Sequence, residues 1–345
     1  MPSGIEAKHI LIIRLSALGD VAMTVPVIRV FSKTYPDVKL TIVSKPSYKP
    51  LFNDIENLHF LEADLYGEHK GFGLLKLAKE AKNIGVNVVA DLHNVIRSKI
   101  ITGYLSLNGI TTAAIDKGRA EKKALINTPS ELKRLKPTHQ RYADVFEALG
   151  FPLNLEEHIF PNKKELTPQL HDLIGKHTKK MIGIAPFAAY QSKLYPLEQM
   201  KEVIFNLNED NLYKIFLFGG GKKEKEILNE WEVQFENVTN LAGKYNLETE
   251  LNLISNLDLM LAMDSGNGHL AALYNIPVVT LWGVTHPYAG FTPFNQPDEH
   301  QVVVDRSAYP LIPTSVYGNT FPAGYEDAIG SIPVATVLQK IKDII

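Results

Sequence analysis

Short apolar runs alternate with amphipathic segments in the first half of the chain. The runs His9–Ile13, Lys39–Val43 and Val86–Ala90 are rich in β-branched residues and have the length of buried strands. Segments with the apolar spacing of helices lie at Val21–Tyr35 and Ile96–Leu107. Because parallel strands need crossover connections and are buried on both faces, this order predicts a parallel sheet covered by helices.

The second half repeats this alternation. Strands are predicted at Met181–Ala185, Lys214–Phe218, Asp258–Ala262 and Pro277–Leu281, and each has a helical pattern beside it. The sequence therefore predicts an α/β protein with two Rossmann-like halves.

The domain limits follow from a change in composition. Pro161–Lys180 mixes Pro, Gly and charged residues around one short helical segment, as a linker does. We predict an N-terminal Rossmann-like domain over 1–165, a second over 178–330 and a C-terminal helix over 331–345. In a two-lobed fold such a helix either stays on the second lobe or crosses back to the first.

Composition removes several classes of protein. The 345 residues include no cysteine, which excludes disulfides, a thiolate nucleophile and thiolate-bound zinc or iron–sulfur clusters. Met1–Lys8 is mixed in character and the apolar run Ile10–Ile13 after it is short, so no secretory signal is predicted. Since no run approaches the ~18 apolar residues of a membrane span, we expect a cytoplasmic protein with at most peripheral membrane contact.

Charge is unevenly distributed. The net charge of −2 argues against bulk binding of nucleic acid. Residues 95–141 nevertheless hold ten basic and three acidic residues, which form either a solvated surface or a site for an anionic partner or lipid headgroup. The basic residues are Arg97, Lys99, Lys117, Arg119, Lys122, Lys123, Lys133, Arg134, Lys136 and Arg141.

The first motif with candidate chemistry is Arg14–Val21, where the first predicted strand ends and a helix begins. Ligands bind at such strand ends in open α/β sheets. Gly19 is the single glycine of the motif, so the G-x-G-x-x-G fingerprint of NAD enzymes is missing. Asp20 either caps the helix or presents a carboxylate that takes a proton from a hydroxyl group.

Two glycine-containing loops follow strands in the second half. Gly219, Gly220 and Gly221 let a ligand reach backbone amides, and Glu224 one turn later can accept hydrogen bonds from ribose; a tight turn alone is the other explanation. Ser265 and Gly266 open a helix whose N-terminal amides suit a diphosphate. Beside them, Asp264 caps the helix or contacts hydroxyls, and His269 is either a phosphate donor or a buried helix histidine.

A third loop, Gln191–Pro196, carries Lys193, which is either a point charge for a phosphate leaving group or a solvated lysine. Three phosphate-suited loops at strand carboxyl ends converge on one edge of a sheet. The chain contains no Asp-x-Asp, H-E-x-x-H or P-loop motif, and its eleven histidines show no metal-ligand spacing. We therefore predict a reaction that uses neither a metal nor a cofactor.

Four segments resemble glycosyltransferase family 9, whose best-known members are ADP-heptose:lipopolysaccharide heptosyltransferases. The segments are IIRLSALGDVAMTVPVIRVF, APFAAYQSKLYPLEQM, FGGGKKEKE and LAMDSGNGHLAALYNIPVVTLWG. They occur in order across residues 9–290. The resemblance implies a GT-B fold, in which two Rossmann-like domains face each other across a cleft. It also implies inverting, metal-independent transfer of a heptose-like sugar from ADP-heptose to the inner core of lipopolysaccharide.

The resemblance assigns roles to individual residues. It implies that Asp20 is the general base, that Lys193 contacts the donor phosphates and that Glu224 contacts ribose. It also implies that Asp264, Ser265, Gly266 and His269 form the diphosphate loop. Gly219, Gly220 and Gly221 are expected to bind the donor as well. Many members have hydroxyl residues where this chain has Ala188 and Ala189, so Ser192 is the substitute donor contact.

The acceptor is expected on the first half. The segment ADLHNVIRSKI resembles the family's acceptor side, and the expected contacts are Ser16, Asn94, Arg97, Ser98 and Arg141. Anionic Kdo sugars and lipid A phosphates would explain the local excess of positive charge, and would place the protein at the cytoplasmic face of the inner membrane.

Two other functions fit the same architecture. A nucleotide-sugar 2-epimerase-like enzyme would act on the donor without an acceptor. A non-catalytic protein that binds nucleotide sugars or glycolipids is suggested by Ala188 and Ala189.

Overall fold

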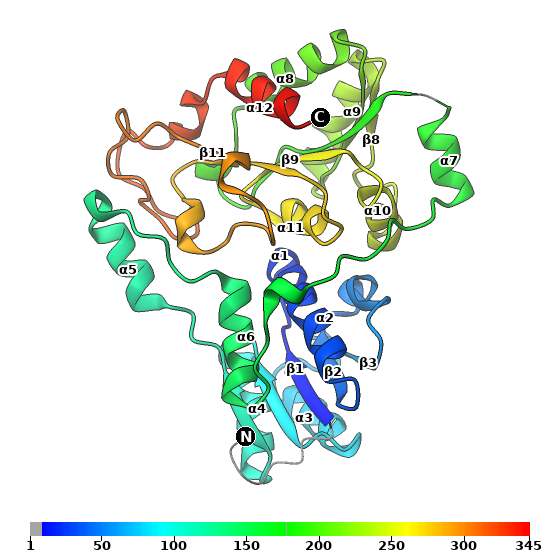
Figure 1. Ribbon diagram of the computed structural model, residues 1–345, viewed down its shortest axis with the longest axis vertical. Helices are drawn as coiled ribbons and strands as arrows, with labels where there is room; N and C mark the ends of the chain where they lie inside the picture. Colours follow the sequence, from blue (N-terminus) through cyan, green and yellow to red (C-terminus); the bar gives the residue numbers. More distant parts are fainter. Residues whose placement is uncertain (1–8, 177) are drawn as a thin grey trace. The chain divides into compact units, whose positions relative to one another are not determined.

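The computed structural model describes residues 9–176 and 178–345 (Figure 1). The prediction about a secretory signal falls on Met1–Lys8 and lies outside these residues. The chain forms two compact units. The first consists of Met1–Lys117 and Thr138–Ile159, and the second of Gly118–Pro137 and Phe160–Ile345.

The described part of the first unit contains a five-stranded parallel sheet in the order β3-β2-β1-β4-β5. The apolar run of β1 lies at its centre, where Ile10 pairs with Leu40 on one side and Val88 on the other. The strands are β1 (His9–Ile13), β2 (Lys39–Ser44), β3 (Leu58–Glu62), β4 (Val88–Asp91) and β5 (Thr111–Ala114).

Helices cover both faces of this sheet. On one face, Leu77 of α3 and Ile101 of α4 join Leu11 and Val89 of the strands in one buried cluster. Elsewhere in the unit, α2 and α6 pack through Phe31 and Phe146, whose ring centroids are 4.9 Å apart. The helices are α1 (Leu18–Ala22), α2 (Thr24–Thr34), α3 (Gly73–Asn83), α4 (Ile96–Leu107) and α6 (Thr138–Ala148).

The second unit contains, within its described residues, a six-stranded parallel sheet in the order β11-β10-β9-β6-β7-β8. Its strands are β6 (Lys180–Ala185), β7 (Tyr213–Leu217), β8 (Val238–Asn240), β9 (Leu259–Met263), β10 (Val278–Trp282) and β11 (Gln301–Val303). Its helices are α5 (Arg119–Asn127), α7 (Pro168–Ile174), α8 (Leu197–Glu209), α9 (Lys222–Gln234), α10 (Leu247–Ile254), α11 (Gly266–Ala272) and α12 (Val334–Ile344).

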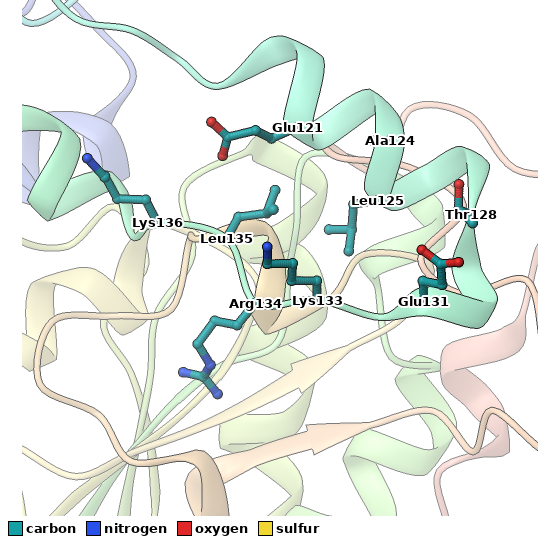
Figure 2. A pocket seen from close by; sticks show the side chains of 9 residues that line it. All are labelled: Glu121, Ala124, Leu125, Thr128, Glu131, Lys133, Arg134, Leu135 and Lys136. Carbon is teal, nitrogen blue, oxygen red and sulfur yellow. The ribbon is translucent and has the colours of Figure 1, made fainter.

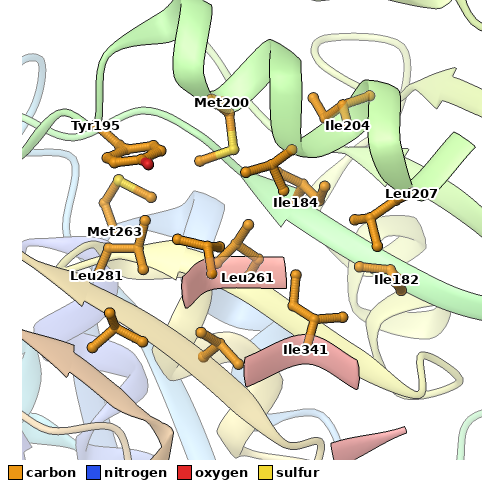
Figure 3. Packing of buried hydrophobic residues seen from close by; sticks show 14 of the residues in the cluster. Ile182, Ile184, Tyr195, Met200, Ile204, Leu207, Leu261, Met263, Leu281 and Ile341 are labelled. Carbon is orange, nitrogen blue, oxygen red and sulfur yellow. The ribbon is translucent and has the colours of Figure 1, made fainter. Parts of the chain in front are cut away.

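The C-terminal helix belongs to the second unit. Figure 3 shows Ile341 of α12 among apolar side chains of β6, β9 and α8. Val337 and Ile341 are fully buried there, and Lys342 forms an ion pair of 2.8 Å with Asp210 at the end of α8. Of the two placements left open by the sequence, α12 therefore takes the one on the second lobe, because its apolar face is covered there.

Residues 118–137 also pack with the second unit, although the predicted limits place them inside the first domain. The ammonium of Lys122 lies 4.0 Å from the ring centroid of Phe291, and the guanidinium of Arg134 lies 4.5 Å from that of Tyr288. The backbone N–H of Leu135 donates to the carbonyl of Tyr288 over 2.9 Å. Contacts made by side chains far apart in sequence therefore decide where this segment, which we call the arm, is held.

The arm divides the basic stretch of residues 95–141. Arg97, Lys99, Lys117 and Arg141 belong to the first unit, and the other six basic residues belong to the arm. The stretch is thus not one continuous surface of either unit. Among the described residues, no helix combines the length and the apolar content needed to cross a bilayer.

Candidate functional site

In the first unit, the candidate site begins where β1 ends. The Arg14 guanidinium is buried there, and its Nη2 lies 2.6 Å from Oδ2 of Asp20. Nη1 of Arg14 donates to the carbonyl of Leu92 over 2.8 Å, which fixes the guanidinium in place. The Asp20 side chain is 35% exposed, so one face of a firmly held carboxylate meets solvent.

Asp20 supports the first turn of α1 without being its N-cap, and its role as a proton acceptor stays a prediction. It is the third residue of α1, whose N-cap is Ala17, and Oδ2 accepts a long hydrogen bond of 3.4 Å from the Ala17 N–H. An acidic side chain in the first turn also interacts favourably with the helix dipole. The structure therefore gives Asp20 a supporting place in α1 and leaves its carboxylate accessible.

Sequence analysis missed Arg14 as a functional residue. A buried arginine is stable only with compensating partners, so Arg14 and Asp20 depend on each other. The signal was available, because a cation at the end of an apolar strand is unusual and Asp20 follows within two helical turns.

His93 is a second residue beside this ion pair that the sequence did not single out. It is buried, and the N–H of Leu15 donates to its Nδ1 over 3.4 Å. Burial, followed by the positive charges of Arg14 and Lys117, lowers the pKa of His93 to about 3. The imidazole is thus neutral near pH 7, and it places a hydrogen-bonding ring near Asp20 without adding charge.

A cluster of aromatic and basic side chains lies at the same strand ends. The ring of Tyr66 has Lys45 Nζ 5.3 Å and Arg97 Cζ 5.8 Å from its centroid. Lys45 also lies 5.9 Å from the ring centroid of Tyr48. Burial, the neighbouring Tyr66 and the charge of Asp20 raise the pKa of Tyr48, so this cluster extends to the candidate base. The exposed ring of Tyr66 between two cations is a combination that suits an anionic sugar.

Three of the predicted acceptor contacts, Ser98, Asn94 and Arg141, make hydrogen bonds within the first unit. Ser98 is fully buried, and its hydroxyl exchanges hydrogen bonds of 3.0 Å with the backbone of Val95 to cap α4. Asn94 has a left-handed backbone with φ 46°, and its side-chain amide donates to the Ile115 carbonyl. Arg141 is buried and donates to the Asp116 carbonyl over 3.4 Å. Ser16 is half-buried after β1, and Arg97 is exposed.

In the second unit, the structure brings two predicted residues together. Lys193 ends the short 3-10 helix η4 (Gln191–Lys193), and its Nζ lies 3.0 Å from Oδ2 of Asp264 at the end of β9. The hydroxyl of Thr285 donates to the same oxygen over 3.0 Å. Both members of the ion pair are largely buried, so Asp264 holds the ammonium at the start of α11.

The stem of Lys193 is held by a glycine turn that no sequence pattern singled out. Gly318 has φ +85°, and a Cβ there would lie 2.5 Å from Cδ of Lys193. The buried hydroxyl of Ser192 donates to the carbonyl of Gly318 over 2.5 Å. Ser192 therefore fastens this turn, and its donor contact stays a prediction.

The first turn of α11 has the features predicted for an anion site. Ser265 is its N-cap, and the buried Oγ has no hydrogen-bond partner among the described residues. Gly266 is the first helical residue, and His269 is buried within the same helix. Because the first N–H groups of a helix have no partners inside it, this turn can bind an anion next to Lys193.

The glycine loop before α9 differs from the prediction. Oε2 of Glu224 accepts hydrogen bonds from the N–H groups of Gly220 and Gly221, at 2.7 and 3.1 Å. These two amides, predicted to be open to a ligand, thus serve to cap α9. Gly219 is tightly enclosed, since a Cβ there would lie 3.1 Å from Cδ1 of Leu228. The other oxygen of Glu224, Oε1, remains the one that can accept from ribose.

Comparison with known proteins decides the family. The model of glycosyltransferase family 9 (heptosyltransferase) matches residues 74–320, which is most of the chain. The chain belongs to glycosyltransferase family 9. It is therefore a glycosyltransferase, as the sequence motifs predicted.

Individual relatives agree with this. The chain is 26% identical, over 89% of its length and 88% of the relative's, to the lipopolysaccharide core heptosyltransferase OpsX of Haemophilus influenzae. A family 9 glycosyltransferase from Veillonella parvula has a similar structure, with a TM-score of 0.76 at 19% identity, covering 99% of this chain and 98% of that one. The E. coli heptosyltransferase WaaC with ADP gives a TM-score of 0.68 at 16% identity, with 98% and 100% covered. The predicted GT-B fold is confirmed.

The family 9 chain also carries a cavity away from these residues. It measures about 410 Å³ and lies between α5 and the segment that returns from it (Figure 2). None of the predicted site residues lines it, so it is separate from the sites described above. The lining residues are Glu121, Ala124, Leu125, Thr128, Glu131, Lys133, Arg134, Leu135 and Lys136.

No group of three or more His, Asp or Glu side chains within residues 9–176 and 178–345 is placed to hold a metal ion. The expectation of a metal-free reaction remains a prediction for this family 9 enzyme.

Proposed function

We propose that this family 9 enzyme transfers heptose from ADP-heptose to the lipopolysaccharide inner core, with inversion at the anomeric carbon and without a metal. The observation that carries the proposal is the half-exposed Asp20 carboxylate, held by the buried Arg14 at the end of β1. The similarity to OpsX supports the acceptor, and the similarity to WaaC with ADP supports the nucleotide.

The second unit would bind the donor. Backbone amides at Ser265 and Gly266 and the side chain of His269 would contact the diphosphate, beside the ammonium of Lys193. As the bond from the anomeric carbon to the diphosphate oxygen breaks, negative charge grows on that oxygen, and a fixed cation stabilises it. Asp264, 3.0 Å from Lys193, keeps the ammonium in position before the donor arrives.

Asp20 would act on the acceptor. It accepts the proton of the acceptor hydroxyl while that oxygen attacks the anomeric carbon from the face opposite the diphosphate, which inverts the configuration. Arg14 keeps the carboxylate oriented toward solvent through their 2.6 Å ion pair. The neutral His93 stays out of the charge balance because its pKa is lowered to about 3.

The aromatic cluster suggests how the acceptor is recognised. The 72% exposed ring of Tyr66 offers an apolar face to a sugar, and Lys45 and Arg97 offer cations to its carboxylate or phosphate groups. This composition fits an anionic inner-core sugar. The proposal includes a location at the cytoplasmic face of the inner membrane, where such acceptors carry lipid anchors.

The decisive experiment is the Asp20→Asn variant, assayed with ADP-heptose and a soluble inner-core acceptor after dialysis against a metal chelator. Because a general base contributes roughly 10²–10⁴-fold, turnover should fall by that factor, while ADP affinity measured by calorimetry stays unchanged. Activity of the wild type after dialysis tests the metal-free part of the proposal.

The matched control is Asp54→Asn. Asp54 pairs with Arg29 over 2.8 Å in the same unit, so its loss removes a comparable ion pair away from β1. It should leave turnover within about twofold of wild type, because neither Arg29 nor Asp54 belongs to the candidate site. Turnover of Asp20→Asn equal to that of this control would refute Asp20 as the base.

A further inference from the structure

Large apolar side chains are left exposed at one end of two neighbouring helices in the first unit. Phe72, at the N-cap of α3, is 94% exposed, and Ile96, the first residue of α4, is 79% exposed. Leu75 and Ile100, one turn further along, are also exposed. Together with Tyr66, these residues form what we call the α3–α4 surface.

The fold places these residues together. Helices α3 and α4 pack against each other on one face of the sheet, through Leu77 and Ile101 among others. Each begins at the carboxyl edge, because each follows a strand of the same parallel sheet. The Arg97–Tyr66 contact of 5.8 Å joins the loop before α3 to the first turn of α4.

The turn before α3 holds Phe72 outward. Gly71 has the left-handed φ of +59°, and the N–H of Gly73 donates to the carbonyl of Lys70 over 3.0 Å. A Cβ on Gly73 would lie 2.1 Å from the carbonyl oxygen of Glu68, so only glycine permits this close turn. The backbone conformation of this turn therefore keeps the side chain of Phe72 exposed.

Positive charge surrounds the α3–α4 surface. Lys70 precedes the turn, Lys99 lies on the first turns of α4, and Lys45 and Arg97 flank Tyr66. The nearby acidic side chains interact with groups of their own loop and helix. Glu68 pairs with Lys76, and Asp64 accepts hydrogen bonds from the Gly67 and Glu68 N–H groups. The surface thus combines apolar side chains with a positive rim.

We propose that the α3–α4 surface docks the first unit on an anionic phospholipid bilayer, with Phe72 and Ile96 inserted among the lipids. Exposed apolar side chains with cations around them match the acyl chains and the anionic headgroups of such a bilayer. If the proposed function holds, this docking brings the carboxyl edge that carries Asp20 to a lipid-linked acceptor.

The test is co-sedimentation of the full chain with vesicles of equal parts phosphatidylethanolamine and phosphatidylglycerol, without donor or acceptor. Wild type should bind them and should bind pure phosphatidylcholine vesicles far less, since the latter lack anionic headgroups. Phe72→Ser and Ile96→Ser should each weaken binding by about tenfold, the scale expected for one buried apolar side chain.

Leu107→Ser is the matched control. Leu107 is 91% exposed on the same helix, at the end opposite Ile96, so its loss should leave binding unchanged. Circular dichroism and melting temperature show whether each variant is folded. The proposal is overturned if wild type does not bind vesicles, or if Phe72→Ser binds them as well as Leu107→Ser does. It is also overturned if ultracentrifugation shows a dimer that forms in wild type and is lost in Phe72→Ser.

These outcomes are distinguishable from failure of the proposed function. Asp20→Asn should bind vesicles like wild type even when it has lost turnover. Phe72→Ser should transfer sugar to a soluble acceptor at the wild-type rate and to a vesicle-embedded acceptor more slowly.

Discussion

Buried charged side chains in both units hold a more exposed or reactive neighbour in place. Arg14 holds Asp20 at 2.6 Å, and Asp264 holds Lys193 at 3.0 Å. The sequence predicted Asp20, Lys193 and Asp264 as site residues, but it gave no means of pairing the last two. Lys193 and Asp264 come into contact because η4 packs at the carboxyl end of β9. This packing is tertiary, so no local sequence pattern reveals it.

Gly318 allows the position of Lys193 to be tested without changing its charge. In Gly318→Ala, the new Cβ would lie 2.5 Å from the lysine stem and must displace it. We expect kcat to fall about tenfold or more, because a displaced cation stabilises the leaving group less well. Steady-state kinetics with separate kcat and KM values measure this effect.

Gly324→Ala is the control for backbone strain alone. Gly324 has the same φ of +85°, but a Cβ there meets nothing within 4 Å. Both variants should lose roughly 1–2 kcal/mol of stability, the cost of a left-handed non-glycine residue. If kcat falls equally in both, the turn does not position Lys193.

The sequence predicted the strands that lie inside the two sheets better than the strands at their edges. The runs that became β1, β4, β6 and β10 are buried along their whole length or nearly so, and buried parallel strands consist of continuous apolar residues. Edge strands carry no such signal: β3 has only half-buried and exposed residues, and β8 spans three residues. The sequence patterns predicted neither strand.

The two carboxylate oxygens of Glu224 allow its capping role and its ribose-binding role to be tested separately. Its Oε2 caps the helix, and its ribose role remains a prediction that Oε1 would fulfil. Glu224→Ala should lower stability by about 1 kcal/mol through loss of the cap. It should also weaken ADP binding about tenfold, as loss of a hydrogen bond to a charged group does. Chemical denaturation and calorimetry measure the two effects.

Asn246→Ala isolates the capping effect. Asn246 caps α10 by accepting from the Thr249 N–H over 2.9 Å, so its loss should cost similar stability and leave ADP affinity unchanged. Unchanged ADP affinity in Glu224→Ala would mean that Glu224 is a cap only.

At the scale of the whole molecule, buried histidines in both units make stability depend on pH. Burial and nearby arginines lower the pKa of His93 to about 3 and that of His286 to about 4. Unfolding returns both to their ordinary range near 6.5, so the unfolded chain binds protons that the folded chain excludes. Stability should therefore fall as pH drops from about 6.5, by roughly 1.4 kcal/mol per pH unit for each histidine.

Melting temperatures measured between pH 7 and pH 4.5 check this prediction. His93→Gln and His286→Gln should each flatten the pH dependence, because each removes one proton taken up on unfolding. His171→Gln, on the exposed face of α7, is the control for loss of a histidine at the surface. If melting temperature depends on pH in the same way in all three variants, the two buried histidines are not the source of the pH dependence.

The limits of prediction for the whole chain lie in the arm. Composition and motif order indicated two Rossmann-like halves and the family. The position of Gly118–Pro137 depends on Lys122 and Arg134 meeting the rings of Phe291 and Tyr288, more than 150 residues later in the sequence. No local pattern encodes such contacts, so this segment was grouped with its sequence neighbours.

The arm also limits how the gene can be divided. Since the polypeptide passes from one unit to the other after Lys117, again after Pro137 and a third time after Ile159, no single cut yields two self-sufficient fragments. A fragment ending near residue 165 would carry the arm with its aromatic partners missing. Independent expression of the first unit requires joining Lys117 to Thr138 with a short linker, and the excised piece must be supplied to the second unit.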